Sequence, residues 1–536
     1  MSERVLLGDE GLALGSVHAG LSAAYAYPGT PSTEILEFLL EYQEEHGRPH
    51  AAWCINEKTA YAQALGACFV GRRALVSMKH VGLNVAADPF MNSALVATHG
   101  GLVVAVADDP GMHSSQNEQD SRFYADFARV MCLEPGSQQE CYDMTREAFD
   151  LSEKFGVPVM LRITTRLAHS RTVVKLRAPR AENEVRKAPQ RASWILLPGN
   201  ARRAWRSLLE RQREMVAWSE AAEWNTLALA PDNHELGVIT AGIARNYYQE
   251  NLPELAHAPS HLHIGAYPLP VEKIRQLAAH VKRLLVLEDG YPFIERQLAG
   301  LLPQPVEVTG KLTGALPPDG ELNPDLVRAA LGLPTRAGVK LEGITLPNRP
   351  PQLCQGCPHG HAYKALKKAL EPYDTNMVTS DIGCYTLGAL PPYSAIESCV
   401  CMGASVGMAK GAAEAGFFPV TAVIGDSTFL HSGVAPLMDA VSANTNMTLL
   451  ILDNQAIAMT GGQPPRMPSS RLHDVVLGIG VDPKHCHVVE AMPRQVDAIA
   501  ELIGSEIRHE GLSVIIAVRE CLETARRKRR EAVVTA

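Results

Sequence analysis

The sequence predicts an α/β protein built from three doubly wound α/β domains. Short apolar segments rich in β-branched residues alternate along the chain with segments of helical spacing. These apolar segments are continuous rather than alternating, which is typical of parallel strands covered on both faces. The chain also has 536 residues, and because a single hydrophobic core seldom grows beyond about 250–300 residues, we expect about three domains.

The first domain is expected over residues 1–175, as a parallel sheet with connecting helices. Five apolar segments have the length and composition of its buried strands. They are residues 23–27, 51–55, 74–78, 102–107 and 158–163. Residues 176–235 contain Pro, Arg and Trp with weak periodicity. We therefore predict a connecting segment there, with one amphipathic helix near residues 204–217.

Two further α/β domains are expected in the rest of the chain. The second covers residues 236–345, and its clearest strands are residues 237–242 and 283–290. A Pro-rich segment at residues 346–351 is a plausible linker behind it. The third domain covers residues 352–536.

Composition and charge exclude several classes of partner. A net charge of −8, 46% apolar residues and no long basic tract describe a mildly acidic globular protein, which argues against nucleic acid or a membrane surface as the main partner. No segment reaches the roughly 18 uncharged apolar residues of a membrane span, and no signal-type segment opens the chain. We expect a cytoplasmic protein with eleven reduced cysteines. The basic residues 525–531 favour a solvated helix end over a docking segment.

The third domain contains a strand–helix–strand unit with polar residues at both strand ends. The apolar run at residues 418–425 stops at Gly425-Asp426, and the run at residues 448–453 stops at Asp453-Asn454. Residues 434–443 between them have helical spacing. A right-handed crossover joins such parallel strands, so Asp426 and Asn454 should meet at the carboxyl edge of the sheet, where open α/β folds bind ligands.

This pair predicts a divalent cation site. A carboxylate from Asp426, an amide oxygen from Asn454 and the backbone carbonyl of Ala456 are hard oxygen donors. They would leave half of an octahedron open for diphosphate oxygens and water, which suits Mg²⁺. Taken singly, each half is better explained as a turn or a cap. The spacing of the two together favours the metal site.

These residues carry a resemblance to a known family. The pattern resembles the diphosphate-binding signature of thiamine diphosphate enzymes, Gly-Asp-Gly followed roughly thirty residues later by Asn, with Ser427 in place of the third residue. Residues 425–433 and 452–463 are similar to the catalytic subunits of indolepyruvate:ferredoxin oxidoreductases, and so are three strings in the first domain. These are residues 79–89, 108–122 and 162–166, so the resemblance reaches to about residue 520. It implies pyrimidine-type, transketolase-C-like and diphosphate-type domains in that order.

The resemblance assigns roles to residues at both ends of the chain. A glutamate in the first turn of a helix is usually only a favourable charge against the helix dipole. Glu57, however, matches the glutamate that hydrogen-bonds the aminopyrimidine ring of the cofactor, and His80 and His359 are further candidates for the catalytic site. The implied cofactor-binding residues are Pro28, Gly29, Thr30, Glu57, Gly356, Cys357, His359, Asp381, Gly383, Cys384, Met402, Gly403, Gly425, Asp426, Ser427, Asn454, Ile457, Ala458, Met459 and Thr460.

A glycine every fourth residue should leave a bare stripe on one helix of the third domain. Gly403, Gly407 and Gly411 form this stripe. Another backbone, or a phosphate at the amino end of the helix, could approach it closely.

Cationic residues of the first domain are candidates for binding a substrate carboxylate or the diphosphate of CoA. Arginine is suited to bidentate contacts with both groups. A polar surface loop is the default explanation for much of this region. The candidates are Lys79, His113, Arg122, Arg162 and Arg166.

Two cysteine pairs, Cys354/Cys357 and Cys399/Cys401, could together hold zinc or an iron–sulfur cluster. We favour the alternative that they hold no metal, because the first pair runs into a helix start and the second into a helix of small residues. In the family that the chain resembles, the segment that matches Cys354 and Cys357 lies beside the cofactor and binds no metal.

The resemblance implies the oxidative decarboxylation of an aryl 2-oxo acid such as indolepyruvate, with transfer of the acyl group to CoA. Thiamine diphosphate supplies the electron sink that side chains lack. No Cys-rich ferredoxin-like run follows Cys486 and Cys521. We therefore expect iron–sulfur clusters or a flavin on a partner rather than in this chain.

The expected partners are a smaller second subunit in an (αβ)₂ assembly and ferredoxin or another acceptor. Two alternatives stay open: a non-oxidative decarboxylase or carboligase, and a non-catalytic subunit that keeps the fold.

Overall fold

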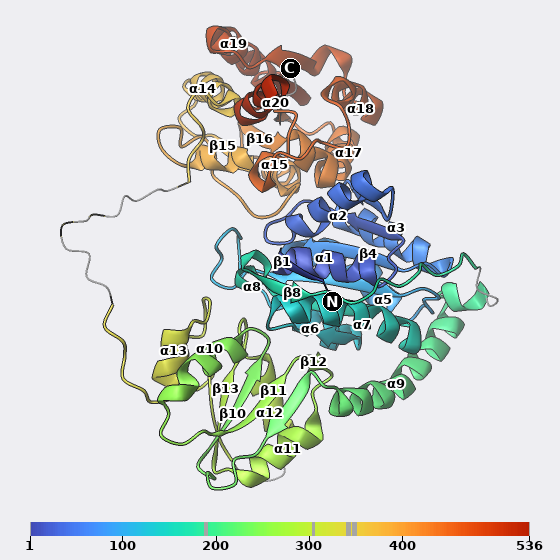
Figure 1. Cartoon of the computed structure of the whole chain (residues 1–536). Helices are drawn as coiled ribbons and strands as arrows, with labels where there is room; N and C mark the ends of the chain where they lie inside the picture. Colours follow the sequence, from blue (N-terminus) through green and yellow to red (C-terminus); the bar gives the residue numbers. More distant parts are fainter. Residues whose placement is uncertain are drawn as a thin grey trace. The chain divides into compact units, whose positions relative to one another are not determined.

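The computed structural model describes residues 2–186, 191–302, 306–338, 343, 345 and 351–534, and it divides the chain into two compact units (Figure 1). Unit 1 covers Met1–Lys340 and unit 2 covers Leu341–Ala536. The α/β class is confirmed, since each unit contains largely parallel sheets joined by helices. The predicted linker falls almost wholly on residues outside those described, and the three-domain division stays a prediction.

A seven-stranded sheet forms the centre of the amino-terminal half of unit 1. Its strand order is β12-β6-β7-β5-β4-β2-β3, and every neighbouring pair is parallel except β12 with β6. All five predicted strands are present, within a residue or two of the expected ends. The strands are β2 (Ala23–Ala26), β3 (His50–Trp53), β4 (Ala74–Lys79), β5 (Leu102–Asp108), β6 (Met131–Leu133), β7 (Val159–Thr164) and β12 (Ala266–Tyr267).

Helices connect these strands and bury both faces of the sheet, as expected for continuous apolar strands. A short antiparallel pair, β1 (Glu3–Leu7) with β8 (Arg171–Lys175), lies beside this domain. The helices are α1 (Gly8–His18), α2 (Thr33–His46), α3 (Glu57–Phe69), α4 (His80–Val85), α5 (Ala87–Ser93), α6 (Arg122–Ala128), α7 (Gln138–Phe155) and α8 (Thr165–His169).

A second, five-stranded sheet follows in unit 1, with the order β14-β13-β10-β11-β9. Its strands are β9 (Asn225–Ala228), β10 (Leu236–Ala241), β11 (Ser260–Ile264), β13 (Arg283–Leu287) and β14 (Glu307–Thr309). The helices of this part of the chain are α9 (Pro198–Ala221), α10 (Ala244–Asn251), α11 (Val271–His280), α12 (Phe293–Leu301) and α13 (Pro324–Ala330). The predicted amphipathic helix is thus present as α9.

Strand pairing crosses two of the expected domain boundaries. β9 lies in the expected connecting segment but pairs with β11 of the second sheet. β12 lies in the expected second domain but pairs with β6 of the first sheet. The buried side chain of Asn225 helps to fix both strands, because its amide donates to the Ala266 carbonyl (3.0 Å) and accepts from the Gly265 backbone N–H (2.9 Å). Such long-range pairing has no local signal in the sequence.

Unit 2 contains a five-stranded, fully parallel sheet in the order β15-β16-β17-β19-β18. Its strands are β15 (Met377–Ser380), β16 (Val420–Gly425), β17 (Met447–Asp453), β18 (Cys486–Glu490) and β19 (Leu512–Val518). The principal helices are α14 (Pro358–Leu370), α15 (Ala404–Glu414), α17 (Val434–Ala443), α18 (Leu472–Ile479), α19 (Val496–Ile507) and α20 (Leu522–Val534). The predicted strand–helix–strand unit is therefore confirmed as β16, α17 and β17.

The sheet of unit 2 is covered on both faces, as a doubly wound fold requires. Successive strand residues face opposite sides, so Leu450 packs in one hydrophobic cluster with α14 and α19, whereas Ile451 packs in another with α15, α17 and α18. The predicted basic helix end is present as α20. Arg527 on this helix donates to the carbonyls of Gly461 (2.9 Å) and Gly462 (3.0 Å), so it attaches the helix to its own unit.

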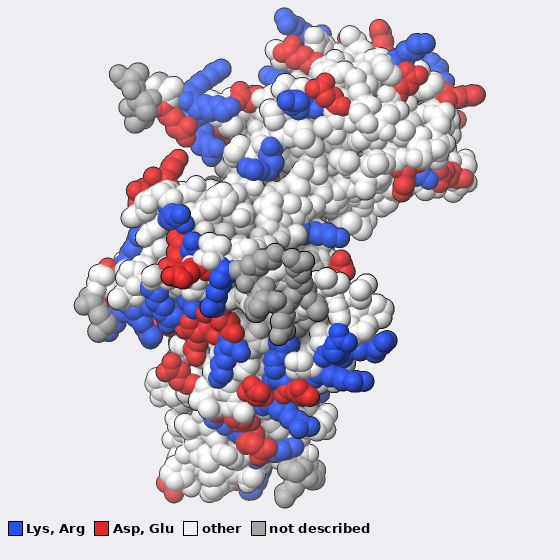
Figure 2. Space-filling model, turned by 90° about the vertical axis from the view of Figure 1, so that its right-hand side faces the viewer, with Lys and Arg blue, Asp and Glu red and all other residues white. Residues whose placement is uncertain are grey.

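Charged side chains of both signs are interspersed on the face drawn in Figure 2, and neither sign forms an extended patch there. Within the described residues, no helix has the length and apolarity needed to cross a membrane.

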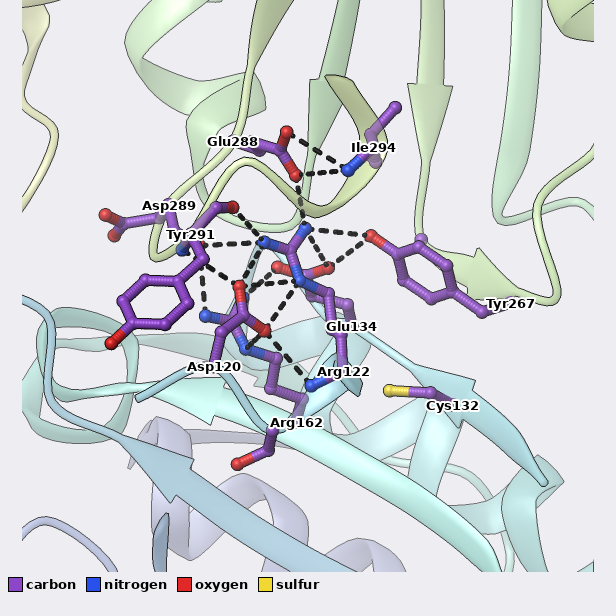
Figure 3. Close-up of polar contacts among 12 residues, drawn as sticks. Asp120, Arg122, Cys132, Glu134, Arg162, Tyr267, Glu288, Asp289, Tyr291 and Ile294 are labelled. Carbon is purple, nitrogen blue, oxygen red and sulfur yellow. Dashed lines mark hydrogen bonds and ion pairs between the residues drawn. The ribbon is translucent and has the colours of Figure 1, made fainter. Parts of the chain in front are cut away.

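A buried ion-pair network joins the two sheets of unit 1 (Figure 3). The side chains of Arg122 and Arg162 are fully buried. Arg162 Nε lies 2.6 Å from the Asp108 carboxylate at the end of β5, and Arg122 lies 3.0 Å from the Glu288 carboxylate that follows β13. Asp120 contacts both guanidinium groups. Burial raises the pKa of Asp120, but the two arginines outweigh burial and hold this pKa below its ordinary value.

The prediction that Arg122 and Arg162 bind substrate or CoA is therefore wrong. Both guanidinium groups are enclosed by carboxylates and backbone carbonyls, including the Asp289 carbonyl 3.0 Å from Arg162. Arginine in a buried position needs such compensation, because an unpaired charge there is very costly. The two residues hold the sheets together instead.

Removing one of these buried cations should destabilise unit 1. In Arg162→Met, three carboxylates lose their common partner, and we expect a loss of about 3–5 kcal/mol in unfolding free energy. Arg166→Met is the matched control, because the Arg166 side chain is 45% exposed in its pair with Glu321, and an exposed pair contributes about 1 kcal/mol or less. Chemical denaturation followed by circular dichroism measures both. Equal losses in the two variants would contradict the structural role of Arg162.

Candidate functional site

The two predicted metal ligands of unit 2 meet at the carboxyl edge of its sheet. β16 and β17 are neighbouring parallel strands, with Gly425 opposite Leu452. Asp426 therefore begins the segment after β16 beside Asn454, which begins the segment after β17. The Gln455 backbone N–H donates to Asp426 Oδ2 at 3.2 Å and ties the two loops together. Gln455 has a left-handed backbone (φ +60°), a strained conformation that is often kept at functional sites.

A second carboxylate, Asp453, joins this pair and was not predicted. Burial and, second, the neighbouring Asp453 together raise the pKa of Asp426 to about 8. Burial also raises the pKa of Asp453. Two adjacent buried carboxyls cannot both ionise without a cation, so the pair retains a proton. The only sequence signal for Asp453 is its place at the end of β17, next to Asn454.

These oxygen donors fit a hard divalent cation such as Mg²⁺. A cation would compensate the negative charge that a proton otherwise neutralises. Asn454 Oδ1 accepts from the Ala456 backbone N–H (3.2 Å), so the loop already turns around this amide. The use of the Ala456 carbonyl as a ligand stays a prediction.

His359 lies next to Asn454. The His359 side chain is buried, and burial lowers its pKa to about 4, so the ring is neutral at pH 7. Its Nε2 lies 3.4 Å from Asn454 Nδ2. A neutral ring can accept from the amide N–H, which leaves the amide oxygen directed away from the histidine. His359 therefore orients a metal ligand, as a supporting group commonly does.

A pocket of about 110 Å³ opens beside Asn454 and His359, and four cysteines line it. They are Cys354, Cys357, Cys384 and Cys521. Cys399 and Cys401, which from the sequence could join the first two but are not expected to bind a metal, are exposed and do not line this pocket. Burial raises the pKa of Cys384 to about 12, with smaller contributions from the other three thiols. Among the described residues, no three of these sulfur atoms lie within 4.8 Å of one another, a wider spacing than one zinc ion would give.

Asp381 has a structural role at the amino end of α15. Its carboxylate accepts from the backbone N–H groups of Gly403 (3.1 Å) and Ser405 (3.2 Å), and from the Tyr385 hydroxyl. These amides are therefore already paired, and the suggestion that a phosphate approaches them is not supported. A Cβ at Gly407 or Gly411 would meet nothing within 4 Å in the part of the chain that the structure describes. Only Gly403 of the predicted stripe makes a close approach, to Ser432.

The other predicted cofactor residues of unit 2 lie on loops near the predicted metal ligands, Asp426 and Asn454. Tyr385 packs so closely that a Cβ at Gly425 or Gly383 would lie 2.6 or 2.4 Å from its ring. The Ser427 backbone N–H donates to Asp426 Oδ1 at 2.7 Å. A bridge from Ile457 to Gln463 closes the loop that carries Ala458, Met459 and Thr460. Gly356 and Met402 lie in the loops before α14 and α15.

The carboxyl edge of the seven-stranded sheet in unit 1 gathers the predicted residues of the first domain. Pro28, Gly29 and Thr30 follow β2, and Glu57 follows β3. Glu57 is buried at the first position of α3, where the Asn56 side chain caps the helix by accepting from the Thr59 N–H (2.8 Å). Its carboxylate lies against Gly82, because a Cβ there would meet Glu57 Oε1 at 2.6 Å.

Lys79 and His80 follow β4 at the same edge. The Lys79 ammonium donates to the Ser114 carbonyl at 2.7 Å, and burial lowers its pKa to about 8. His80 is buried, and burial lowers its pKa. His113 and Arg166 share one carboxylate, Glu321, at 3.5 and 2.5 Å. Sequence spacing predicted the first two positions, but not this shared carboxylate.

Relatives with similar sequences decide the family. The chain is 38% identical over 538 residues to the indolepyruvate oxidoreductase subunit IorA of Methanothermobacter thermautotrophicus, covering 96% of this chain and 86% of that protein. It is 36% identical to the IorA subunit of Archaeoglobus fulgidus (98% and 88% covered) and 34% identical to that of Pyrococcus abyssi (97% and 86% covered).

The chain belongs to the IorA family of indolepyruvate oxidoreductase subunits. Two family models match this IorA-family chain: the thiamine diphosphate-binding domain of pyruvate flavodoxin/ferredoxin oxidoreductases over residues 15–204, and the carboxyl-terminal binding domain of thiamine pyrophosphate enzymes over residues 381–531. The resemblance found in the sequence is thereby confirmed. A solved 2-oxoglutarate:ferredoxin oxidoreductase from Magnetococcus marinus shares the fold, with a TM-score of 0.50 and 16% identity over 61% of this chain and 65% of that one.

Gly82→Ala should displace the Glu57 carboxylate. Its new methyl group would overlap Glu57 Oε1, and a shift of about 1 Å at a catalytic group can cost about 100-fold in rate. We expect a loss of that order in thiamine-dependent turnover and in exchange of the cofactor's C2 proton. Gly66→Ala on the same helix α3 is the control, because its Cβ would meet nothing within 4 Å. Normal exchange in Gly82→Ala would remove Glu57 from this role.

The carboxyl pair predicts opposite effects of pH on folding and on metal binding. The pKa of Asp426 lies above the ordinary 3.8 in the metal-free fold, so its contribution to metal-free stability is lost as pH rises from about 4 to about 8. Binding of Mg²⁺ must displace the proton, so affinity should rise about tenfold per pH unit and level off near pH 8. Titration calorimetry with Mg²⁺ and thiamine diphosphate measures this.

Asp453→Asn tests the cause of that dependence. Without the second carboxylate, the pKa of Asp426 falls, and the affinity should level off at a lower pH. Asp439→Asn, an exposed position on α17, is the control. If the affinity for Mg²⁺ stops rising at the same pH in the parent and in Asp453→Asn, the two carboxyls do not share a proton.

Proposed function

We propose that this chain binds thiamine diphosphate with Mg²⁺ and, together with a smaller partner subunit, oxidatively decarboxylates an aryl 2-oxo acid such as indolepyruvate to the acyl-CoA. The observation that carries the proposal is the meeting of Asp426, Asp453 and Asn454 at one sheet edge. Membership of the IorA family supports the choice of substrate.

The residues of unit 2 would hold the cation and the diphosphate. Asp426 and Asn454 supply oxygen ligands, and the proton shared with Asp453 leaves when the cation binds. His359 stays neutral and orients the Asn454 amide. When bound, thiamine diphosphate supplies the electron sink that decarboxylation of a 2-oxo acid requires.

The residues of unit 1 would act on the ring and on the substrate. Glu57 would hydrogen-bond the aminopyrimidine ring, and its contact with Gly82 fixes the position of its carboxylate. Lys79, whose ammonium is held at the Ser114 carbonyl, remains mostly cationic at pH 7 and could attract a substrate carboxylate. Arg166 and His113 are the remaining candidates for the diphosphate of CoA, because both are about half exposed beside Glu321.

We further propose, in place of the expectation from the sequence that clusters lie on a partner rather than in this chain, that the first electron acceptor is an iron–sulfur cluster held in unit 2 by Cys354, Cys357, Cys384 and Cys521. These thiols line one pocket next to Asn454 and His359. Among the described residues no three of these sulfur atoms lie within 4.8 Å of one another, which suits a cluster better than one ion, and four cysteine thiolates are the usual ligands of a cluster. Their raised pKa values belong to the metal-free thiols, which lose protons on binding iron. Electrons would then pass to the partner subunit, ferredoxin or another acceptor.

The activity is tested with the natively purified complex. Indolepyruvate, CoA and a one-electron dye should give dye reduction that depends on CoA, on thiamine diphosphate and on Mg²⁺. Asp426→Asn should abolish it. Aldehyde release without dye reduction would favour a non-oxidative decarboxylase, and no uptake of thiamine diphosphate would favour a non-catalytic subunit.

The cluster is tested separately by iron analysis and electron paramagnetic resonance of the reduced complex, purified without oxygen. We expect Cys384→Ser to lose about four iron atoms per chain relative to the parent. Cys399→Ser is the control, because Cys399 is exposed and outside the pocket. Equal iron content in the two variants would contradict the assignment.

A further inference from the structure

A cluster of three possible metal ligands, none of which is discussed above, lies in unit 1 on three different helices. Asp9 belongs to α1, Glu34 to the first turn of α2, and His169 to the end of α8. One ligand atom from each lies within 4.8 Å of the others. Among the described residues, this is the one group of three His, Cys, Asp or Glu side chains that meets this criterion.

The cluster contains buried acceptors that lack donors. The Asp9 side chain is fully buried, and neither of its carboxylate oxygens has a hydrogen-bond partner. Glu34 Oε2 is also buried and has no hydrogen-bond donor, although His169 Nε2 lies 3.5 Å away. Buried carboxylates are nearly always hydrogen-bonded, because a missing partner costs about 1–3 kcal/mol or more. His169 lies beside Glu34, which raises the pKa of the imidazole, so the chain supplies a cation to Glu34 but, among the described residues, no donor to Asp9.

A proton meets this need only in part. Burial and the nearby Glu34 raise the pKa of Asp9 well above its ordinary value, so the metal-free group is neutral. One proton on Asp9 still leaves the other oxygen of that carboxyl without a donor. A divalent cation contacts all three side chains at once and compensates both carboxylates.

We propose that Asp9, Glu34 and His169 bind a divalent cation of the Mn²⁺, Fe²⁺ or Zn²⁺ class. One imidazole nitrogen with two carboxylate oxygens suits these ions better than Ca²⁺ or Mg²⁺. Two ligands about 2.1 Å from a tetrahedral cation lie about 3.4 Å apart, close to the 3.5 Å between His169 Nε2 and Glu34 Oε2. The side chains of Glu34 and His169 are about one-third exposed, which provides a path for the ion and room for water.

The surrounding fold holds the three ligands in place without the ion. α1 and α8 are in backbone contact, since a Cβ at Gly8 would lie 2.2 Å from the Leu167 carbonyl oxygen. α2 begins three residues after Thr30, at the carboxyl edge of the seven-stranded sheet. An ion here would link three helices at that edge, next to the loop of Pro28, Gly29 and Thr30. It would share no ligand with the proposed Mg²⁺ site of unit 2.

Manganese binding to the full chain tests the proposal. The chain carries Asp426→Asn, so that the Mg²⁺ site is disabled, and Mn²⁺ is used because cysteine thiolates bind it poorly. We expect about one Mn²⁺ per chain with nitrogen coupling in electron spin-echo spectra, because His169 supplies a nitrogen ligand. This Mn²⁺ should also raise the midpoint of thermal unfolding. Cofactor failure does not affect either readout.

The matched variants are His169→Gln and His46→Gln. His169→Gln should lose the nitrogen coupling and weaken Mn²⁺ binding at least about tenfold, whereas His46→Gln at the exposed end of α2 should change neither. Asp9→Asn, an isosteric change, should weaken binding similarly and keep the fold even if His169→Gln does not. Absence of nitrogen-coupled Mn²⁺ in the parent at about 1 mM would overturn the proposal, and so would identical binding in His169→Gln or Asp9→Asn.

Discussion

Parallel strand pairing with right-handed crossovers is the constraint on which the rest of this structure depends. It brings residues that follow different strands to one edge of a sheet, whatever their distance along the chain. In unit 2 it places Asp426 beside Asn454. In unit 1 it gathers the segments that carry Thr30, Glu57 and Lys79. The chemistry proposed for this chain uses these strand ends, while the strands themselves are nearly all core.

Buried carboxylates in this chain fall into two classes that differ in their compensation. Asp108 and Asp120 face arginines inside the protein, where they join the two sheets of unit 1. Asp9 and Asp426 face other carboxylates instead, and their pKa values are raised. The first class supports structure. The second class lacks such compensation, and this difference in local charge separates the structural acids from the metal ligands proposed here.

Only part of the candidate site could be predicted from the sequence. Asp426 and Asn454 were predictable as metal ligands, because each directly follows an apolar strand. Glu57 was found through the family resemblance. The mistaken role for Arg122 and Arg162 had a physical cause: a polar loop usually lies at the surface, but here Asp120, Asp108 and Glu288 draw both side chains inside. The four cysteines of the pocket were not found from the sequence, since Cys384 and Cys521 come together with Cys354 and Cys357 only through the fold.

The sequence by itself determined the α/β class, the strand and helix order, the strand-end position of Asp426 and Asn454, and the family. These follow from local patterns: apolar periodicity, β-branched content and short motifs, which act over a few residues. The tertiary structure alone decided which strands pair across the predicted boundaries, that Asp453 lies close enough to Asp426 to raise its pKa, and that Asp9, Glu34 and His169 meet. Those outcomes depend on contacts between distant segments and on burial, and burial is a property of the packed chain that no local pattern records.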